Sequence, residues 1–307
     1  MGARALAAGC TVILKSDGVT PFSSNALAVL CERAGLPRGA LNVITALENT
    51  PQIGLGLCES DIVKKISFTG STRVGKLVMQ QSSGTLKKLS LELGGNAPFI
   101  VFDDADLEVA VASALCSKFK VTGQTCMCAN RMYVQEGIYD RFCQRLVEEV
   151  KKFCVGDGLQ DDSVTHGPMT IGISKVEEHI KDAVNKNAKV LLGGNRLPSL
   201  GKNFHELTIL GDVNDTMQVA SEETFGPLAA LFKFSTEDEV INRANNCDRL
   251  EFGMVALNTG VISDSSAPFG GVKHSGMGRE GSKYGVEDYM AVKTVITGGI
   301  NTVYTHL

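Results

Sequence analysis

The sequence predicts an α/β protein built around a mainly parallel sheet. Short β-branched runs alternate with amphipathic helical stretches, and Gly and Pro punctuate the ends of these segments. The length of 307 residues allows two packed domains. Hydrophobic residues make up 43% of the chain and charged residues 21%, which are ordinary shares for a soluble globular protein.

The first half of the chain alternates strand and helix regularly. β-branched runs predict strands at 11–15, 41–45, 63–69, 89–93 and 99–102. Helical periodicity predicts helices at 21–34, 70–81 and 106–118. The first of these helices has clear end signals, because Thr20 can cap it, Pro21 suits its first position and Gly35 can stop it.

The second half repeats this alternation. Strands are expected at 132–135, 189–192 and 228–234, and helices at 139–153, 174–186 and 237–246. The alternation then breaks near Cys247-Asp248, and no complete element follows before residues 253–257. Residues 263–285 are rich in Gly and predict a loop.

Composition excludes several classes of function. The net charge is −4 and no basic stripe suggests a nucleic-acid partner. No apolar run reaches the length of a membrane span. Nine cysteines without framework-like spacing indicate a reducing compartment, and we expect a cytoplasmic protein. The five histidines are scattered and Cys126-x-Cys128 lacks zinc-ligand spacing, so no metal site is expected.

The strongest chemical signal is Gly123-Gln124-Thr125-Cys126, a short polar turn between a predicted helix and a predicted strand. A thiol on such a turn is accessible to a substrate and lies near backbone N–H groups that stabilise a thiolate. A cysteine at an arbitrary position is more often a small core residue, so the turn alone leaves both interpretations open.

A second signal is Glu92, which lies in an otherwise apolar strand and is followed by Gly94 and Gly95. Apolar surroundings raise the pKa of a carboxyl group, which suits a general base near neutral pH. A glutamate at the solvent edge of a strand end is an equally good interpretation. The 34 positions between Glu92 and Cys126 fit a strand–helix excursion that returns the chain to the same sheet edge.

Two further segments suit a phosphate or a ribose. Residues 68–75 run from a strand into a helix through Gly70 and Ser71, and N–H groups at a helix N-terminus bind phosphate oxygens. Residues 222–227 combine two acids, an aromatic ring and a Gly-Pro turn. A capped helix start and a plain surface turn are the alternatives, since neither motif is specific alone.

Taken together and in this order, these segments resemble the aldehyde dehydrogenase superfamily. The matching motifs are ISFTGSTRVG, LELGGNAPFIV, GQTC, EETFGP and PFGGVKHSGMGREGSKYG. The second cysteine of GQTCxC and the final Gly-rich run are similar to the succinate-semialdehyde dehydrogenase branch. The resemblance implies a partial NAD(P)-binding domain with a parallel sheet over residues 1–120, an α/β catalytic domain over 121–290, and a tail, 291–307, that can return to an oligomerisation sheet.

The resemblance also implies roles for residues. Cys126 is the expected nucleophile and Glu92 the expected general base. Bound NAD or NADP is expected at Lys15 (adenosine ribose), Gly70, Ser71, Thr72 and Gly75 (pyrophosphate), Leu93 (nicotinamide), Glu223 and Phe225 (nicotinamide ribose). Lys120 and Ser263 are expected to hold the distal carboxylate of the substrate, and Cys126 with Cys128 is expected to form a reversible redox switch.

The chain departs from the family pattern at several places. It starts after a Trp-Asn motif whose Asn donates to the oxyanion, and loss of one such donor typically lowers rates about 10²–10³-fold. A strand and most of a helix are absent near Cys247-Asp248, with a shorter deficit near Thr170. Gly18 stands where the family has a ribose-binding Glu, and Lys120-Val121 replaces an Arg-Asn pair.

The implied reaction is the oxidation of succinate semialdehyde to succinate with reduction of NAD(P), through a thiohemiacetal and a thioester on Cys126. The expected partners are the small aldehyde and further copies of the chain in a homo-oligomer, and a mitochondrial location stays open. Two other functions remain: a non-catalytic relative of the family, and a thiol esterase that needs no cofactor.

Overall fold

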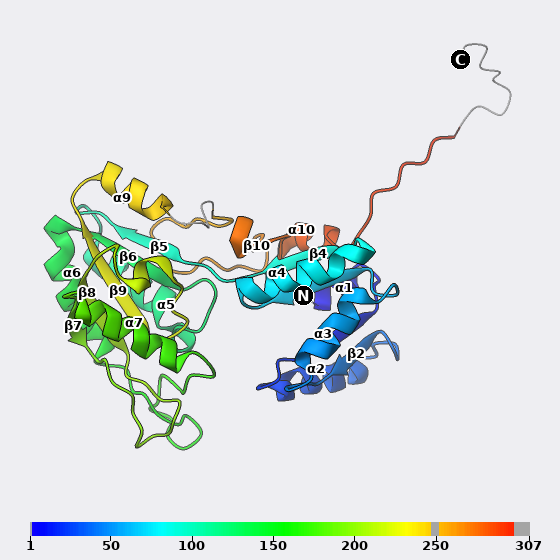
Figure 1. Ribbon diagram of the computed structural model, residues 1–307, viewed down its shortest axis with the longest axis horizontal. Coiled ribbons are helices and arrows are strands. Elements are labelled where there is room, and N and C mark those ends of the chain that lie inside the picture. The colour runs from blue at the N-terminus through cyan, green and yellow to red at the C-terminus, as the bar shows by residue number, and fades with distance from the viewer. Residues whose placement is uncertain (1, 247–251, 298–307) are drawn as a thin grey trace, which may run out of the picture.

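The computed structural model describes residues 2–246 and 252–297, whose helices and strands form two groups side by side (Figure 1). The first group contains α1 (Gly2–Ala7), β1 (Val12–Lys15), α2 (Pro21–Arg33), β2 (Leu41–Ile44), α3 (Thr50–Glu59), β3 (Lys65–Thr69), α4 (Thr72–Ser82), η1 (Ser83–Thr85) and β4 (Lys88–Glu92). The chain returns to this group with η3 (Lys273–Ser275), β10 (Gly276–Met277) and α10 (Ser282–Glu287).

The second group lies between these two passages of the chain. It contains β5 (Ala97–Val101), α5 (Leu107–Lys118), η2 (Lys120–Gly123), β6 (Ala129–Gln135), α6 (Glu136–Val150), α7 (Ile173–Asn185), β7 (Lys189–Leu192), β8 (Thr208–Val213), α8 (Gln218–Ser221), β9 (Leu228–Phe234) and α9 (Glu237–Asn245).

The described strands form three sheets. The second group has a five-stranded sheet of order β5-β6-β9-β8-β7, in which only β7 runs antiparallel to its neighbour. The first group has a parallel pair β1-β2 and a sheet of order β10-β4-β3, in which β3 and β4 are parallel. The predicted α/β class with mainly parallel strands is therefore confirmed.

The hydrophobic core lies on both faces of the five-stranded sheet, because side chains along β6 alternate between the two faces. Met132 and Val134 point to one face of the sheet and pack with α5 and α6, whereas Tyr133 points to the other face and packs with α7 and α9. All buried residues of both clusters lie between Val101 and Ala244. The second group thus contains the main core of the described chain.

The first group is thinly packed by comparison. Its buried hydrophobic residues are Ala5, Cys58, Leu91 and Leu93. Helix α2 has no buried residue, and Phe22 on it is 82% exposed. A two-stranded sheet such as β1-β2 is marginally stable by itself, so this part depends on its contacts with α1 and α2.

Most of the expected elements are present, with shifts of one to a few residues at their ends. The patterns along the chain do not predict α1, α3, β8 or α8. They also predict a loop throughout 263–285, which is wrong for β10 and α10. Strand β10 exists because Gly276 and Met277 pair with Glu92 and Leu91 of β4, a contact distant in sequence that no local pattern reveals.

The change between the two groups does not fall where the domain division was expected. Strand β5 and helix α5 precede residue 121, yet β5 pairs with β6 in the five-stranded sheet. Strand β10 lies within 121–290 but pairs with β4 in the first group. The change from one group to the other thus lies at the turn between Glu92 and Ala97 rather than at residue 120, because β5 pairs with β6 of the five-stranded sheet.

Residues 291–297 are exposed and extend away from the two groups (Figure 1). The remainder of the expected tail, 298–307, and the expected deletion point at Cys247-Asp248 lie outside the described residues. Among the helices that the structure describes, none is long and apolar enough to cross a membrane.

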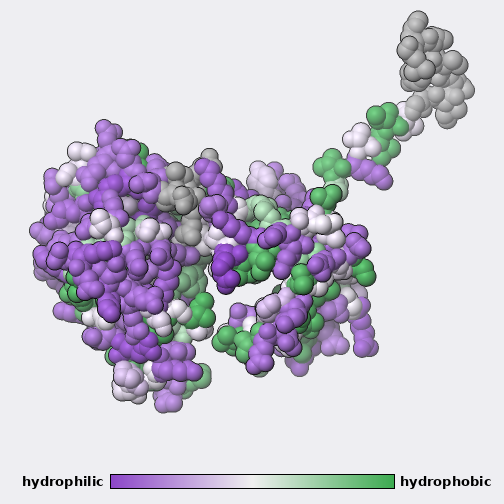
Figure 2. Space-filling view, in the orientation of Figure 1, coloured by the Kyte–Doolittle hydropathy of each residue, from purple (hydrophilic) through white to green (hydrophobic). Residues whose placement is uncertain are grey.

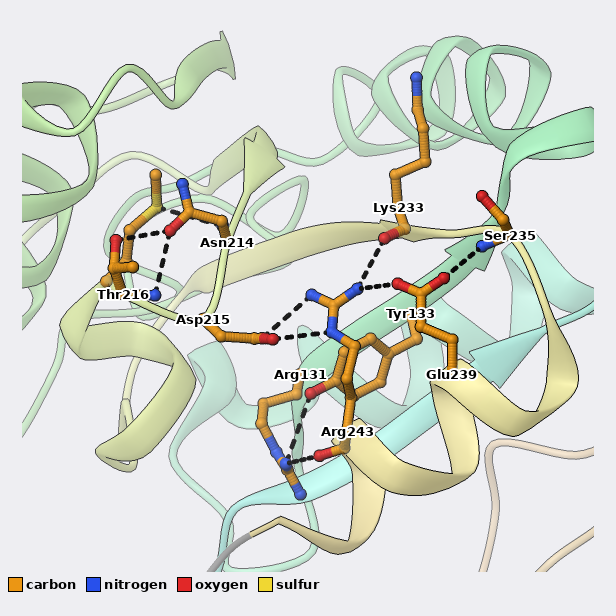
Figure 3. A network of polar contacts seen from close by, with 10 residues as sticks. Arg131, Tyr133, Asn214, Asp215, Thr216, Lys233, Ser235, Glu239 and Arg243 are labelled. Carbon is orange, nitrogen blue, oxygen red and sulfur yellow. Dashed lines mark hydrogen bonds and ion pairs between the residues drawn. The ribbon is translucent and has the colours of Figure 1, made fainter.

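A polar network anchors α9 to the five-stranded sheet (Figure 3). Arg131 is 1% exposed and donates to the carbonyl oxygens of Asn96, Arg243 and Ala244 at 3.0–3.1 Å. Arg243 forms a two-pronged ion pair with Asp215 at 2.9 and 3.0 Å. Carbonyl groups at a helix C-terminus lack partners within the helix, so Arg131 completes the end of α9.

Candidate active site

The candidate site lies where the two groups of elements meet, and Glu92 at the end of β4 lies at its centre. The Gly-rich C-terminal segment closes over this residue: Gly276 pairs with Glu92, and the Leu93 N–H donates to the Ser275 carbonyl at 3.0 Å. A side chain at Gly270 would lie 2.9 Å from the Glu92 carboxylate. Glycine is therefore needed at position 270 for the chain to approach the carboxylate.

Glu92 is only 6% exposed, and its pKa is raised to about 7. Burial is the main cause and repulsion from the Glu280 carboxylate is the second. Arg279, a backbone hydrogen bond from Gly271 and Arg4 act in the opposite direction. A carboxyl group with this pKa exchanges its proton near neutral pH, as a general base must.

Cys126 lies in the loop between η2 and β6 and is partly buried. Its pKa is raised, first by burial and then by repulsion from the carboxylates of Glu92 and Glu223, while its own backbone N–H lowers it. The thiol therefore lies within electrostatic reach of both carboxylates. The Cys126 N–H thus favours the thiolate, as expected, but burial and the two acids outweigh it and the pKa stays raised.

Glu92 and Cys126 were expected at the same edge of one sheet, and this expectation is wrong. Glu92 ends β4 of the three-stranded sheet, whereas Cys126 precedes β6 of the five-stranded sheet. The turn at Gly94-Gly95 carries the chain from one sheet to the other, and a side chain at Gly95 would lie 3.4 Å from the Cys126 carbonyl oxygen. The electrostatic interaction between Glu92 and Cys126 thus crosses the junction between the sheets.

The backbone before Cys126 is unusual. Val121, Thr122 and Gly123 all have positive φ, at 54°, 54° and 71°. A side chain at Gly123 would overlap the Gly226 carbonyl, so the catalytic turn packs directly on the 222–227 segment. The Thr122 hydroxyl donates to the Gly167 carbonyl at 3.1 Å and supports the turn from the other side.

Glu223 is turned toward the same junction. Its carboxylate accepts a hydrogen bond from the Gly95 N–H at 3.1 Å, and a side chain at Gly94 would overlap it. Leu93, the next residue back, is buried against Gly75 of α4, where any side chain would overlap the leucine. The segment after Glu92, the segment 68–75 and the segment 222–227 are thus in contact at Gly75 and Gly94, where a side chain would overlap its neighbours.

The start of α4 suits an anionic ligand. Ser71 caps the helix by accepting a hydrogen bond from the Val74 N–H at 3.3 Å, and the Thr72 hydroxyl donates to the His274 carbonyl at 3.1 Å. Gly70 and Ser71 are exposed. An exposed N-terminus of an 11-residue helix, next to Leu93 and Glu223, fits the phosphates, ring and ribose of a dinucleotide in that order.

Known proteins resemble this chain in sequence and in structure. The model of the aldehyde dehydrogenase family matches residues 1–249 and 247–295. A succinate-semialdehyde dehydrogenase [NADP(+)] of Saccharomyces cerevisiae is 53% identical over 97% of the chain. A 3-sulfolactaldehyde dehydrogenase of Pseudomonas putida is 50% identical over 97% of the chain. A crystal structure of an NADP-dependent enzyme of E. coli covers 95% of the chain with a TM-score of 0.92 and 51% identity.

The chain belongs to the aldehyde dehydrogenase family. It spans 64% of the yeast relative, 65% of the Pseudomonas relative and 64% of the E. coli chain. The two matches to the family model meet at residues 247–249, the point at which the sequence analysis placed a missing strand and helix. The fold of the matched part is retained despite this break.

Some of the residues expected from the aldehyde dehydrogenase motifs are not gathered at the junction by any described contact. Lys15 ends β1, which belongs to the separate two-stranded sheet. The side chains of Lys120 and Ser263 are exposed and form no hydrogen bond or ion pair with the described part of the chain. Phe225 is half-buried beside Glu223.

Cys128, the second member of the expected redox pair, is 2% exposed. Its sulfur lies 2.9 Å from the Thr125 hydroxyl and donates to the Lys118 carbonyl at 3.7 Å. It packs under the loop because β6 begins at the next residue and turns that side inward. The redox role of the pair stays a prediction.

The sequence analysis missed several charged residues of the site. Arg4 forms an ion pair with Glu280 at 2.5 Å and donates to the Arg279 carbonyl at 3.1 Å, and all three surround Glu92. Lys118 is fully buried below the catalytic loop. Lys118 has helical spacing from Val111 and Ala114, and this spacing could have indicated that it lies on the buried face of α5.

Within residues 2–246 and 252–297, no three or more His, Cys, Asp or Glu side chains are placed to hold a metal ion.

Proposed function

We propose that this chain oxidises an aldehyde that carries a distal anion, with succinate semialdehyde as the first candidate, and reduces NAD or NADP. The observation that carries this proposal is the meeting of Cys126 and Glu92 beside the Leu93–Gly95 turn, with Glu223 and the start of α4 on the same side. In this proposal the first group of elements binds the cofactor and the second group supplies the nucleophile.

The first step is attack of the Cys126 sulfur on the aldehyde carbon, and the thiol proton passes to Glu92. This assignment follows from the raised pKa of the thiol and from the pKa of about 7 of the nearby carboxylate, which can receive a proton at neutral pH. The backbone N–H of Cys126 faces the sulfur and is the donor available to the developing oxyanion.

Attack leaves an oxyanion on the thiohemiacetal, which loses a hydride and becomes a thioester on Cys126, while Glu92 releases the thiol proton to solvent. A bound nicotinamide cofactor supplies the hydride acceptor. Glu92 next takes a proton from water, whose oxygen attacks the thioester carbon, and the acid leaves as the thiol re-forms. Two protons thus pass through Glu92, one from the thiol and one from water, and the second returns to the Cys126 sulfur. Glu92 lies buried beneath the segment that contains Gly270.

We assign the cofactor contacts to the residues expected from sequence: the α4 start for the pyrophosphate, Leu93 for the nicotinamide, Glu223 and Phe225 for its ribose, and Lys15 for the adenosine ribose. A side chain at Gly18 would lie 2.7 Å from the Ala46 carbonyl oxygen and 2.8 Å from Leu47. No acidic side chain fits there to repel a 2′-phosphate, which supports use of NADP, the cofactor named for the yeast relative.

The substrate class is supported by the relatives. Succinate semialdehyde and 3-sulfolactaldehyde both pair an aldehyde with an anionic group, a carboxylate or a sulfonate. Lys120 begins the turn that leads to Cys126 and supplies a positive charge, and Ser263 supplies a hydroxyl. A lysine is a weaker partner than an arginine for a carboxylate because it lacks the paired donors.

The test is a turnover assay with succinate semialdehyde and saturating NAD⁺ or NADP⁺, read as absorbance of the reduced cofactor. We expect NADP⁺-dependent turnover that is lost in Cys126→Ala and reduced by about 10²-fold or more in Glu92→Gln. Lys120→Met should raise KM for succinate semialdehyde more than for an uncharged aldehyde of similar length. Absence of turnover in the wild type would favour a non-catalytic relative, and ester hydrolysis without cofactor would favour the esterase.

We also propose that the chain forms a homo-oligomer through its C-terminal tail. In the described part of that tail Val292 is 102%, Val295 77% and Ile296 89% exposed, which is costly for a tail that stays in water. Light scattering on the purified chain tests this proposal, since deletion of 291–307 should leave a monomer.

A further inference from the structure

A lysine with no exposed surface lies directly below the catalytic loop. Lys118 is the last residue of α5 and is 0% exposed. Its ammonium group donates to the Asn130 side chain at 3.0 Å and to the Thr224 carbonyl at 3.4 Å. Burial of an ammonium group is costly unless its hydrogen bonds are made, so these two acceptors hold the side chain in one place.

The segment that Lys118 contacts is the turn from Glu222 to Phe225, and a second buried residue holds it. His179 of α7 is 1% exposed, and its Nδ1 lies 2.8 Å from the Thr224 hydroxyl. Lys118 and His179 thus bind two polar groups of Thr224: Lys118 binds its carbonyl and His179 its hydroxyl. Thr224, itself 4% exposed, is tied to α5 and to α7 at once.

Glu223 precedes this tied residue and points the other way, into the candidate active site. Its carboxylate meets the Gly95 N–H at 3.1 Å. Because Thr224 is fixed on its inner side, the backbone at 223 has little freedom and the carboxylate is directed at the Gly94-Gly95 turn. The contacts of Lys118 therefore decide where Glu223 lies.

We infer that Lys118 is a positioning residue for the cofactor site: it fixes the Glu222–Phe225 turn and so directs the Glu223 carboxylate to the Gly94-Gly95 turn. This role rests on the proposed function of that site in binding NAD(P). Lys118 touches neither the reacting atoms nor the cofactor and acts through Glu223. Its positive charge, enclosed with the Glu223 carboxylate, adds an attraction that the neutral His179 does not provide.

The electrostatics of the pocket agree with this geometry. Burial lowers the pKa of Lys118 to about 8, while the nearby Cys128 thiol and the Glu223 carboxylate act to raise it. Lys118 is therefore charged at neutral pH and responds to Glu223 through space.

Hydrogen–deuterium exchange on the full chain without cofactor tests the inference directly. Lys118→Met keeps the volume of the side chain but removes the donor and the charge. We expect the Gly95 amide and the amides of residues 222–226 to exchange about 10-fold faster or more, with α6 and β9 unchanged. Lys175→Met is the matched control, because Lys175 pairs with Glu222 of the same turn at 2.9 Å from an exposed position. It should leave both segments as in the wild type.

Isothermal titration with NADP⁺ supplies the second readout. Lys118→Met should raise the Kd for NADP⁺ about 10-fold in the wild-type background. In the Glu223→Gln background it should not raise the Kd further, as expected for two residues that act in series. Equal weakening in both backgrounds, unchanged exchange at 95 and 222–226, or faster exchange throughout the second group would each overturn the inference. If Lys118→Met does not fold, Lys118→Gln, which retains a donor, is read in the same way. If the wild type does not bind NADP⁺, the proposed function fails, and the exchange experiment still decides the role of Lys118.

Discussion

At the scale of single residues, burial raises the pKa of Glu92 and the neighbouring Glu280 carboxylate raises it further. The folded pKa of about 7 lies above the unfolded value of 4.5, so the folded chain keeps a proton that the unfolded chain loses. Glu92 therefore contributes stability below about pH 4.5, and this contribution is lost as the pH rises through about 7. Glu280→Gln removes the repulsion between the two carboxylates and lowers the pKa of Glu92. The stabilising contribution of Glu92 should then be lost at lower pH.

Urea unfolding between pH 5 and 9 measures this effect. The free energy of unfolding of the wild type minus that of Glu92→Gln isolates the Glu92 titration, and the same difference in the Glu280→Gln background gives its shifted midpoint. Glu287→Gln, at an exposed position of α10, is the control and should not move the midpoint. An unshifted midpoint in Glu280→Gln would show that burial alone sets the pKa of Glu92.

Val121 is a second residue whose local conformation leads to a prediction. It is β-branched and 61% exposed, and it has φ 54° and ψ 39°. The left-handed region costs an ordinary residue roughly 1–2 kcal/mol, whereas Asn tolerates it. Val121→Asn should raise the free energy of unfolding by about 1 kcal/mol. Val184→Asn, at an exposed helical position of α7, should change it by less than about 0.5 kcal/mol, and an equal gain at both sites would refute the explanation.

The Cys126–Cys128 pair has a third testable property. Both thiols are free, and only the first is partly accessible. If they form a reversible switch, mild peroxide should convert Cys126 to a sulfenic acid that Cys128 captures as a disulfide with loss of water, after the loop has opened. Mass spectrometry should find a Cys126–Cys128 bridge that dithiothreitol removes. Sulfinic acid on Cys126 beside a free Cys128 thiol would exclude the switch, and Cys128→Ser is the control.

At the scale of elements, α9 is anchored to the sheet by side chains of its own and by Arg131 of β6. Arg131 of β6 binds the last carbonyl oxygens of the helix, and Arg243 within it pairs with Asp215 (Figure 3). Arg131→Met would leave three buried carbonyl groups without their donor. We expect a loss of at least about 3 kcal/mol of stability, because each unsatisfied group costs about 1–3 kcal/mol.

Denaturant unfolding monitored by circular dichroism checks this expectation. Arg141→Met on α6 removes an exposed arginine and should change the stability by less than about 0.5 kcal/mol. Hydrogen exchange should also become faster in α9 before it does in β6. If the two variants are equally stable, water replaces the guanidinium group without cost.

At the scale of the whole molecule, the two groups of elements differ in how much they bury. Both core clusters lie between Val101 and Ala244, whereas β1, β2 and α2 contain no buried hydrophobic residue. The space-filling view also shows a hollow between the two groups, with hydrophobic residues on both of its walls (Figure 2). Stability should therefore be uneven, with the first group opening at lower free energy.

Native-state hydrogen exchange in low concentrations of urea measures these opening free energies. The amides of β1 and β2 should exchange at least about 10-fold faster than those of β6 and β9, which are buried on both faces. Saturating NADP⁺ should slow exchange in β3 and α4 but leave β6 unchanged. One common opening free energy for β1, β2, β6 and β9 would show that the chain unfolds as a single unit.

Sequence patterns by themselves determined the α/β class, most of the helices and strands, and the identity of Cys126 and Glu92 as candidates. These features depend on local periodicity, on turn chemistry and on motifs of a few residues, all of which can be read along the chain. Tertiary structure alone decided that the two residues meet across two different sheets, that β10 exists, and that Lys118 and His179 hold Thr224. The physical reason is that strand pairing, burial and the electrostatic field at a carboxylate depend on residues far apart in sequence, and no local pattern contains that information.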